Sequence, residues 1–226
     1  MTNTLNLSKE IIFSSSDSNI SRKISLAEKT AKLKKIAPRI YTTNMLDSVE
    51  SIIKRNLIDI LAWRYPNAVI SHRSAHELRP TEKAEFFLTY NFRKKISDLP
   101  GITININEGP KAIEGDIMLN GIYIASEYRW MLECMQISKR QGEHSKILPV
   151  SFIENRLEKM ILIQGEDKLN EFRDKLREVS VLLNMSTEFE KLNRIISALM
   201  STHNVNVLTN DSSRARVAGV PFDAAR

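Results

Sequence analysis

Two histidines in the middle of the chain have the spacing of a metal site. His72 and His76 are four residues apart, so on a helix they would share one face and could both ligate zinc. Zinc would need two further ligands, and the remaining candidates are Glu77, His144 and His203. A short helix with both imidazoles hydrogen-bonded at the surface explains the pair more simply, so we predict no metal site.

A second group combines three carboxylates with a lysine near predicted strands: Glu108, Lys111, Glu114 and Asp116. Some nucleases hold a divalent cation with carboxylates, and a lysine close by completes such a site. The order and spacing here match no such motif, and a charged loop between strands accounts for these residues. A metal-dependent nuclease is therefore the least favoured of three hypotheses for this chain.

Motifs of other catalytic classes are absent from the sequence. The chain has only seven glycines, with no glycine-rich phosphate loop and no Gly-x-Ser-x-Gly nucleophile elbow. The single cysteine, Cys134, follows Met131 and Leu132 in an apolar helical pattern, where a reactive thiolate is disfavoured. We therefore predict a protein that is not an enzyme and that uses no cofactor.

The positive charge of the chain is concentrated in one short segment. The 226 residues include 33 basic and 27 acidic ones. Seven of the basic residues lie between Asn19 and Tyr41 against the single acid Glu28, and setting these eight aside leaves 26 of each sign elsewhere. Such a segment favours a polyanionic partner, most often nucleic acid, although a solvated basic helix without a partner has the same composition.

The basic segment has the periodicity of an amphipathic helix over about residues 19–31. One apolar stripe has the spacing i, i+4, i+7 and i+11: Ile20, Ile24, Ala27 and Ala31. The opposite face carries polar side chains: Arg22, Ser25, Lys29 and Lys32. The run of serines and one aspartate at 14–18 supplies several possible N-caps. Leu26 lies near the outer face, where an apolar side chain could touch a thymine methyl group.

A short β-hairpin with a cationic tip follows the predicted helix. Two β-prone runs, 33–36 and 40–43, flank Ala37, Pro38 and Arg39. A basic helix followed by a basic hairpin is the order found in winged helix-turn-helix domains, where the helix enters the major groove and the wing follows the phosphates. Only residues 5–13 remain for supporting helices, so the expected domain is minimal.

The rest of the chain predicts an α+β fold. A helical stripe runs from Asp47 to Tyr65, and β-prone runs follow at 68–70, 85–90 and 102–106. Asn120-Gly121 between apolar pairs predicts a hairpin, and a helix then opens at Ser126. Three apolar helical stripes fill 149–200, and the polar stretch 201–226 predicts a linker or tail.

Composition and termini give an expected location. Apolar residues make up 42% and charged residues 27% of the chain, as in soluble globular proteins. No run approaches the roughly 18 apolar residues of a membrane helix, and the start of the chain lacks the pattern of a signal peptide. We therefore predict a cytoplasmic protein without a membrane partner, whose oligomeric state stays open because no heptad pattern is present.

Four segments in a fixed order resemble AbiEi-like antitoxin domains. They are Lys34–Asn44, Ala68–Ala75, the strand after Leu99-Pro100-Gly101, and Gly121–Ser126. More closely, they resemble the N-terminal half of bacterial Fic-family proteins that carry such a domain, and the similarity extends to Arg214–Asp223. The Fic signature, His-Pro-Phe followed by Gly-Asn-Gly-Arg, occurs nowhere in the chain. The resemblance implies no AMP transfer by these residues.

The resemblance also implies a domain division. It gives a winged-helix-like DNA-binding segment at 1–44, a mixed α/β antitoxin-like domain at 45–148, a helical section at 149–200 and a linker or tail at 201–226. The implied DNA-binding residues agree with those from the charge pattern: Arg22, Lys23, Ser25, Lys29, Lys32, Lys34, Lys35 and Arg39.

Two other functions are favoured over the nuclease hypothesis. The first is a DNA-binding, antitoxin-like transcriptional regulator of a toxin–antitoxin system, with operator DNA as its partner and a cognate toxin as a second candidate partner. The alternative is a protein-interaction module, equivalent to the N-terminal part of a Fic-family protein, that binds or controls a toxin enzyme. In the alternative the basic helix is merely solvated.

Overall fold

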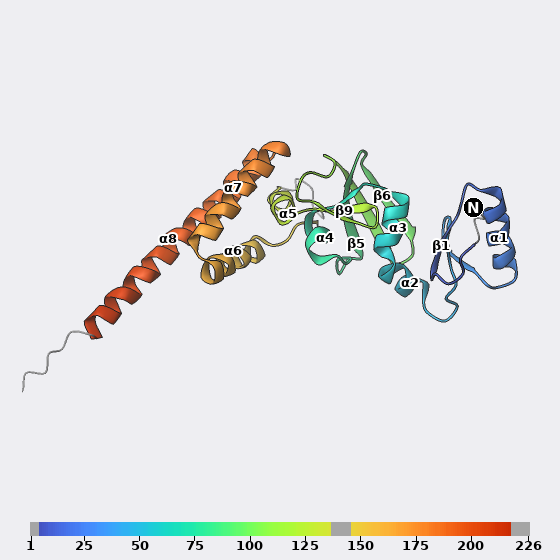
Figure 1. The fold of residues 1–226 in the computed structure, drawn as a ribbon, viewed down its shortest axis with the longest axis horizontal. Coiled ribbons are helices and arrows are strands. Elements are labelled where there is room, and N and C mark those ends of the chain that lie inside the picture. Colours follow the sequence, from blue (N-terminus) through green and yellow to red (C-terminus); the bar gives the residue numbers. More distant parts are fainter. Residues whose placement is uncertain (1–4, 137–145, 218–226) are drawn as a thin grey trace, which may run out of the picture. The chain divides into compact units, whose positions relative to one another are not determined.

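The computed structural model describes residues 5–136 and 146–217. It has the α+β composition that the sequence predicted, with two β-sheets and a helical C-terminal part (Figure 1). The chain divides into two compact units: Met1–Trp130 with Ser138–Ile147, and Met131–Ile137 with Leu148–Arg226. None of the helices within the described ranges is both long enough and apolar enough to cross a membrane.

The first unit begins with a three-stranded antiparallel sheet in the order β1-β3-β2. Its elements are β1 (Ile11–Phe13), α1 (Ser18–Lys29), β2 (Lys34–Ala37) and β3 (Ile40–Thr42). Apolar side chains from α1 and the sheet form a shared small core: Ile12, Ile24, Ala27 and Leu33, with Leu5, Ile20 and Tyr41 packed against them. The described residues before α1 form a strand and no supporting helix, so this region is one helix and a β-hairpin joined by one more strand.

Local hydrogen bonds set both ends of α1. Asp17 caps the N-terminus because its carboxylate accepts bonds from the first free backbone N–H groups, at 2.8 and 3.3 Å. Asp17 lies within the run 14–18, which the sequence predicted to supply the N-cap. The predicted place of Ala31 in the apolar stripe is wrong, since the helix ends at Lys29 and Ala31 is exposed with a φ of 55°. The chain reverses there, and Leu33 enters the core instead.

The strongest helical pattern, Asp47 to Tyr65, forms two helices instead of one. These are α2 (Val49–Arg55) and α3 (Leu57–Arg64). Between them the backbone of Asn56 leaves helical geometry, with φ −105° and ψ 14°. Its side-chain amide donates to Glu10 Oε2 at 2.8 Å, so a tertiary contact accompanies the break.

A mixed six-stranded sheet follows, in the order β6-β7-β5-β4-β9-β8. Its strands are β4 (Val69–Ile70), β5 (Glu85–Tyr90), β6 (Lys94–Leu99), β7 (Ile102–Glu108), β8 (Ile117–Leu119) and β9 (Ile122–Ile124). The pairs β5–β7 and β4–β9 are parallel, and the other neighbours are antiparallel. The predicted strands and the Asn120-Gly121 hairpin are confirmed, and the two turn residues have φ of 51° and 93°, values that Asn and Gly tolerate. The pattern did not predict β6.

Two further helices belong to this part of the chain, α4 (His72–Glu77) and α5 (Glu127–Cys134). The register of the parallel pair places Phe86 opposite Ile104 and Leu88 opposite Ile106, and all four are buried. These four side chains, like those of Ile52 and Ile53 on α2 and Ile60 and Leu61 on α3, belong to the buried apolar residues of this unit.

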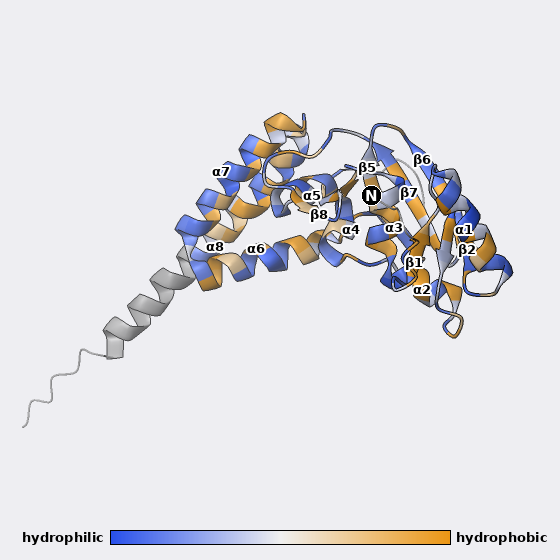
Figure 2. Cartoon of the chain, turned by 45° about the vertical axis from the view of Figure 1, so that its right-hand side comes forward, coloured by the Kyte–Doolittle hydropathy of each residue, from blue (hydrophilic) through white to orange (hydrophobic). Residues whose placement is uncertain are grey.

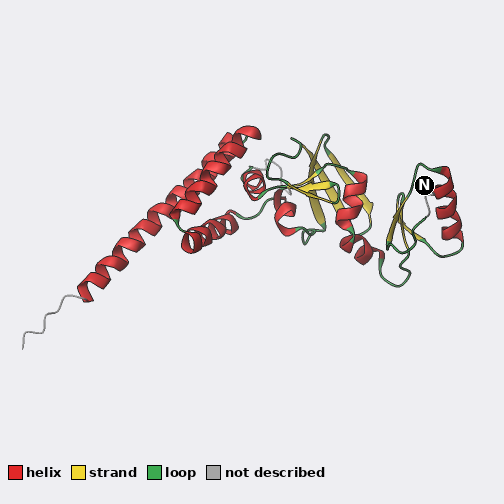
Figure 3. Cartoon of the chain, viewed as in Figure 1, coloured by secondary structure: helices red, strands yellow, loops and turns green. Residues whose placement is uncertain are grey.

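Besides the last residues of α5, the described residues of the second unit form three helices: α6 (Val150–Gln164), α7 (Glu166–Leu182) and α8 (Ser186–Val217) (Figure 3). The helices contact one another, and hydrophilic and hydrophobic residues alternate along them (Figure 2). The predicted stripes are confirmed by the buried residues at their centres, such as Leu157, Leu176 and Leu192. The expected irregular linker from residue 201 is wrong as far as Val217, because α8 continues through a stretch without glycine or proline.

Candidate nucleic-acid interface

Helix α1 exposes three of the four side chains that the sequence assigned to its outer face, Arg22, Ser25 and Lys29, whereas the fourth, Lys32, lies beyond the helix, which ends at Lys29. Ile24 and Ala27 are buried against the sheet, which fixes the rotation of the helix. The exposed positions of the site are Arg22, Lys23, Ser25 and Lys29. Leu26 is also exposed, at 63%, on this outer side. The helix therefore combines three cations, a hydroxyl and one apolar side chain on its solvent surface.

Three more cations follow where α1 leads into the hairpin: Lys32, Lys34 and Lys35, all of them exposed. The register pairs Lys35 with Tyr41, which packs against the core beneath α1, so Lys35 lies on the α1 side of the sheet. Its neighbour Lys34 pairs with Thr42 and lies on the opposite face. These lysines lie at the base of the hairpin, and β2 is an edge strand.

The tip of the hairpin is held differently. Arg39 donates from Nε to the hydroxyl of Ser14 at 2.8 Å, and its guanidinium lies 5.5 Å from the ring centroid of Trp63 on α3. The same indole ring stacks on Phe13 at 4.6 Å, and Arg64 donates to the carbonyl of Pro38 at 3.2 Å. Of the eight predicted site residues, Arg39 thus has a structural role that the sequence did not indicate: it fastens the hairpin tip to α3.

The described part of the chain does not neutralise the cations of α1 and β2. Within residues 5–136 and 146–203, no carboxylate forms an ion pair with any of the six basic residues on α1 and at the hairpin base. Arg55 shows the contrast, because it pairs with both Glu10 and Asp47. A surface with unpaired cations at this density attracts polyanions and releases counterions when it binds them.

The Arg55 pair belongs to the junction between the small sheet and α2. Hydrogen bonds from Arg55 and Asn56 lower the pKa of Glu10 to about 2, and Asn44 adds a third side-chain donor. The same contacts with Glu10 and Asp47 raise the pKa of Arg55. These bonds fasten the start of β1 to the helix that follows the hairpin.

The histidine pair lies in two different environments. His72 is buried, its backbone φ is 53°, and its Nδ1 lies 3.0 Å from the hydroxyl of Ser71. His76 packs against Trp130 with 5.0 Å between ring centroids. In the described part of the chain no three His, Cys, Asp or Glu side chains come together as a metal site would need, and His144 lies outside that part.

One member of the carboxylate–lysine group, Asp116, is engaged in a buried ion pair. Asp116 pairs with Arg129 Nη1 at 2.8 Å, with both side chains fully buried. Its carboxylate also accepts backbone bonds from Ile113 and Ser126, and Arg129 donates to the carbonyls of Pro110 and Lys111 at 2.9 Å. Asp116 therefore holds the loop 109–116 in place. Sequence reasoning missed Arg129, although an arginine next to the apolar run 130–132 was a signal of a buried pair.

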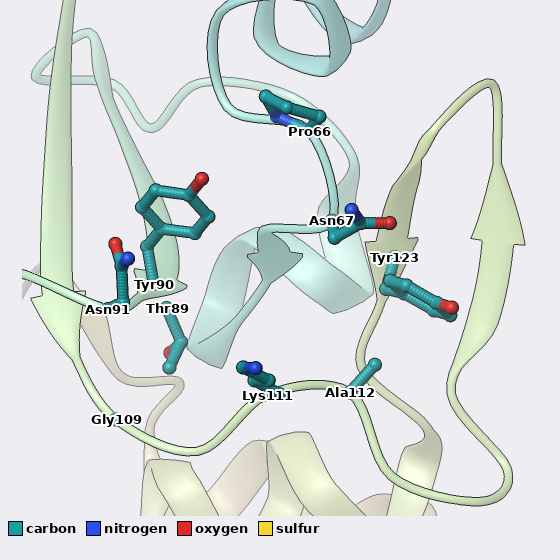
Figure 4. A pocket seen from close by; sticks show the side chains of 9 residues that line it. All are labelled: Pro66, Asn67, Thr89, Tyr90, Asn91, Gly109, Lys111, Ala112 and Tyr123. Atoms are coloured by element: carbon teal, nitrogen blue, oxygen red, sulfur yellow. The ribbon is translucent and has the colours of Figure 1, made fainter.

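A pocket of about 460 Å³ opens beside this loop, where β5 and β7 end and β4 and β9 begin (Figure 4). It is lined by Pro66, Asn67, Thr89, Tyr90, Asn91, Gly109, Lys111, Ala112 and Tyr123. The polar groups are amides, hydroxyls and one ammonium group. Among the described residues, the lining includes no carboxylate, histidine or cysteine, and its one charged group is Lys111.

Comparisons with protein-family models, with curated proteins and with solved structures found no match. Support for a function comes from the charge and geometry of α1 and the β2–β3 hairpin.

Proposed function

We propose that this chain binds duplex DNA through α1 and the base of the β2–β3 hairpin, and that it acts as an antitoxin-like transcriptional regulator. The observation that carries the proposal is the set of exposed, unpaired cations on α1 and the start of β2. The resemblance to AbiEi-like antitoxin domains supports the regulatory role. No step of the proposal requires catalysis.

The dimensions of α1 suit the major groove, which admits one α-helix. With Ile24 and Ala27 turned into the core, the outer side of the helix is free to face the bases. Arg22 and Ser25 supply a bidentate cation and a hydroxyl for base edges or phosphates, and Leu26 supplies an apolar contact for a thymine methyl group.

The lysines after the helix contact phosphates in this arrangement. Lys32 lies between the helix and β2, and Lys35 lies on the α1 side of the sheet, where the DNA backbone would pass beside the groove. Arg39 contributes indirectly, because its contacts with Ser14 and Trp63 hold the hairpin tip. The base of the hairpin, rather than its tip, is thus the phosphate-contacting part.

A mobility-shift titration tests the proposal with the full chain, DNA from upstream of its own reading frame and an unrelated duplex. With four to six phosphate contacts, the logarithm of the binding constant should fall with the logarithm of salt concentration, with a slope on the order of −4 to −5. The double variant Lys29→Ala, Lys32→Ala should bind more weakly to both duplexes and reduce the slope by about two. Absence of salt-dependent binding to either duplex contradicts the proposal.

A matched control removes the same charge elsewhere. Lys83 and Lys159 are exposed lysines outside α1 and the hairpin, so Lys83→Ala, Lys159→Ala should bind DNA as the unmodified chain does. In a reporter assay on the upstream DNA, the unmodified chain and this control should repress, while the Lys29, Lys32 variant should not. Equal repression by all three contradicts the regulatory role of α1.

A further inference from the structure

Strand β8 is an edge strand whose three residues are all apolar and all exposed. Among the described residues, β8 pairs only with β9 and ends the six-stranded sheet. The exposed fractions are 63% for Ile117, 50% for Met118 and 37% for Leu119. Edge strands of soluble proteins commonly carry charges or prolines that block pairing with another chain. β8 has neither.

The hydrogen bonds of β9 show which backbone groups of β8 point outward. The N–H groups of Tyr123 and Ala125 donate to β4, to the carbonyls of Ala68 and Ile70, at 2.8 and 2.9 Å. The alternate residues of β9, Ile122 and Ile124, therefore turn their backbone groups toward β8, and they pair there with Leu119 and Ile117. It follows that the N–H and C=O of the central residue, Met118, point to the free edge.

We propose that β8 pairs antiparallel with β8 of a second copy of this chain. In an antiparallel pair, one residue that exchanges both backbone bonds with its own counterpart lies on the two-fold axis. Met118 supplies the donor and the acceptor in each copy. Ile117 of one copy then lies opposite Leu119 of the other, and the two six-stranded sheets become continuous.

The chemistry of the strand favours a second copy over a charged partner strand. The facing residues in this register are apolar on both sides, so no charge is left uncompensated and no like charges meet. Beyond the strand, Asp116 would lie opposite Asn120, and its carboxylate is already occupied by Arg129 within its own copy. Because only three residues pair, the interface is small, and we expect a dimer that dissociates on dilution. This pairing does not depend on the proposed binding of DNA.

Sedimentation velocity of the full chain over a range of concentrations tests the pairing. The weight-average mass should rise with concentration from that of a monomer toward twice that mass. Ile117→Lys places a charge within the interface, next to Met118 and at a position exposed in the monomer, and it should weaken the dimer at least tenfold. Met118→Pro removes the outward N–H, which an edge strand tolerates, and should have the same effect. Leu46→Lys is the matched control, since Leu46 is 96% exposed in the same unit. This variant should dimerise as the unmodified chain does.

Hydrogen exchange gives a second measurement on the unmodified chain. The amide of Met118 should exchange more slowly as the protein concentration rises, and this change should disappear in the Ile117→Lys variant. A single monomer mass at every concentration overturns the proposal. A dimer that persists in both β8 variants also overturns it. The same holds if the exchange rate of the Met118 amide does not change with protein concentration.

Discussion

Helices α1 and α7 both carry many exposed cations, yet their surroundings differ. On α7 each of three cations has a carboxylate one turn away: Lys168 with Glu171 at 2.7 Å, Lys175 with Glu178 at 2.7 Å and Arg177 with Asp174 at 3.0 Å. On α1 the only acid is Glu28, and it pairs with none of the cations within the described residues. The number of basic residues on a helix therefore does not tell which cations are paired, and two helices of similar basic content differ in this respect.

Burial separates a third kind of cation from both helices. Arg129 has no exposed side-chain surface and is bonded to a carboxylate and two carbonyls. The pairs of α7 are more than half exposed, so solvent screens them and each contributes little to stability. The structure thus contains unpaired, exposed-paired and buried-paired cations, and we expect each to respond differently to substitution.

The largest effect should come from the buried pair. Arg129→Met leaves the Asp116 carboxylate buried without its cation and should lower the free energy of unfolding by about 3–5 kcal/mol, measured by urea denaturation. The control Lys175→Met breaks an exposed pair of α7 and should cost less than about 0.5 kcal/mol. Equal losses in the two variants would show that burial does not separate these cations.

The second largest effect concerns DNA and compares α1 with α7 directly. Arg22→Ala, Lys29→Ala, Lys35→Ala removes three unpaired cations and should weaken duplex binding on the order of 100-fold at physiological salt. Lys168→Ala, Lys175→Ala, Arg177→Ala removes the same charge from α7 and should leave affinity unchanged. Fluorescence anisotropy with one labelled duplex measures both. Similar losses from both triple variants would mean that only net charge matters.

A smaller effect should follow when α1 is made to resemble α7 without removing any cation. Ser25 is exposed four residues before Lys29, so Ser25→Glu creates an i, i+4 pair of the favourable orientation. The new carboxylate should pair with Lys29 and repel phosphate, which should weaken DNA binding by about tenfold. Ser25→Ala is the control and should retain most of the affinity. If Ser25→Glu binds as tightly as Ser25→Ala, the unpaired state of α1 is not what supports binding.

The sequence predicts those elements whose local pattern agrees with their surroundings. The helix predicted over 19–31 forms as α1, Ser18–Lys29, and the hairpin at Asn120-Gly121 forms as expected, because capping, periodicity and turn chemistry are local. The sequence does not predict strand β6, because its first residues are basic and exposed and it has no alternation of apolar and polar residues. It is a strand because it pairs with β7. The break at Asn56 escapes it too, since it coincides with a contact to Glu10, 46 positions earlier.

The candidate site likewise has features that the sequence predicts and features that depend on the folded chain. Exposure of the α1 cations follows from the apolar stripe, so the sequence alone predicts it. The anchoring of Arg39 depends on Trp63, which comes from another element and reaches the hairpin tip only in the folded chain. The same holds for Asp116, whose partner Arg129 lies 13 positions along the chain. Contacts between distant segments decide which charged groups are free to bind a ligand.

The smallest effect should come from a substitution of Glu10. Its partner, Arg55, is exposed like the α1 cations but is paired with carboxylates. Folding lowers the pKa of Glu10 from 4.5 to about 2, because the folded state provides hydrogen bonds to the charged carboxylate. The resulting stabilisation is fully present above pH 4.5, and it is lost as the pH falls from there toward 2. Glu10→Gln should therefore lower Tm by about 2 °C at pH 7, given the exposure of the pair, with a difference that vanishes near pH 2. Calorimetry of both proteins between pH 7 and pH 2 measures this difference, and Glu82→Gln, at an exposed position, serves as the control. A Glu10→Gln penalty that stays constant down to pH 2 would mean that ionisation of Glu10 does not fasten β1 to α2.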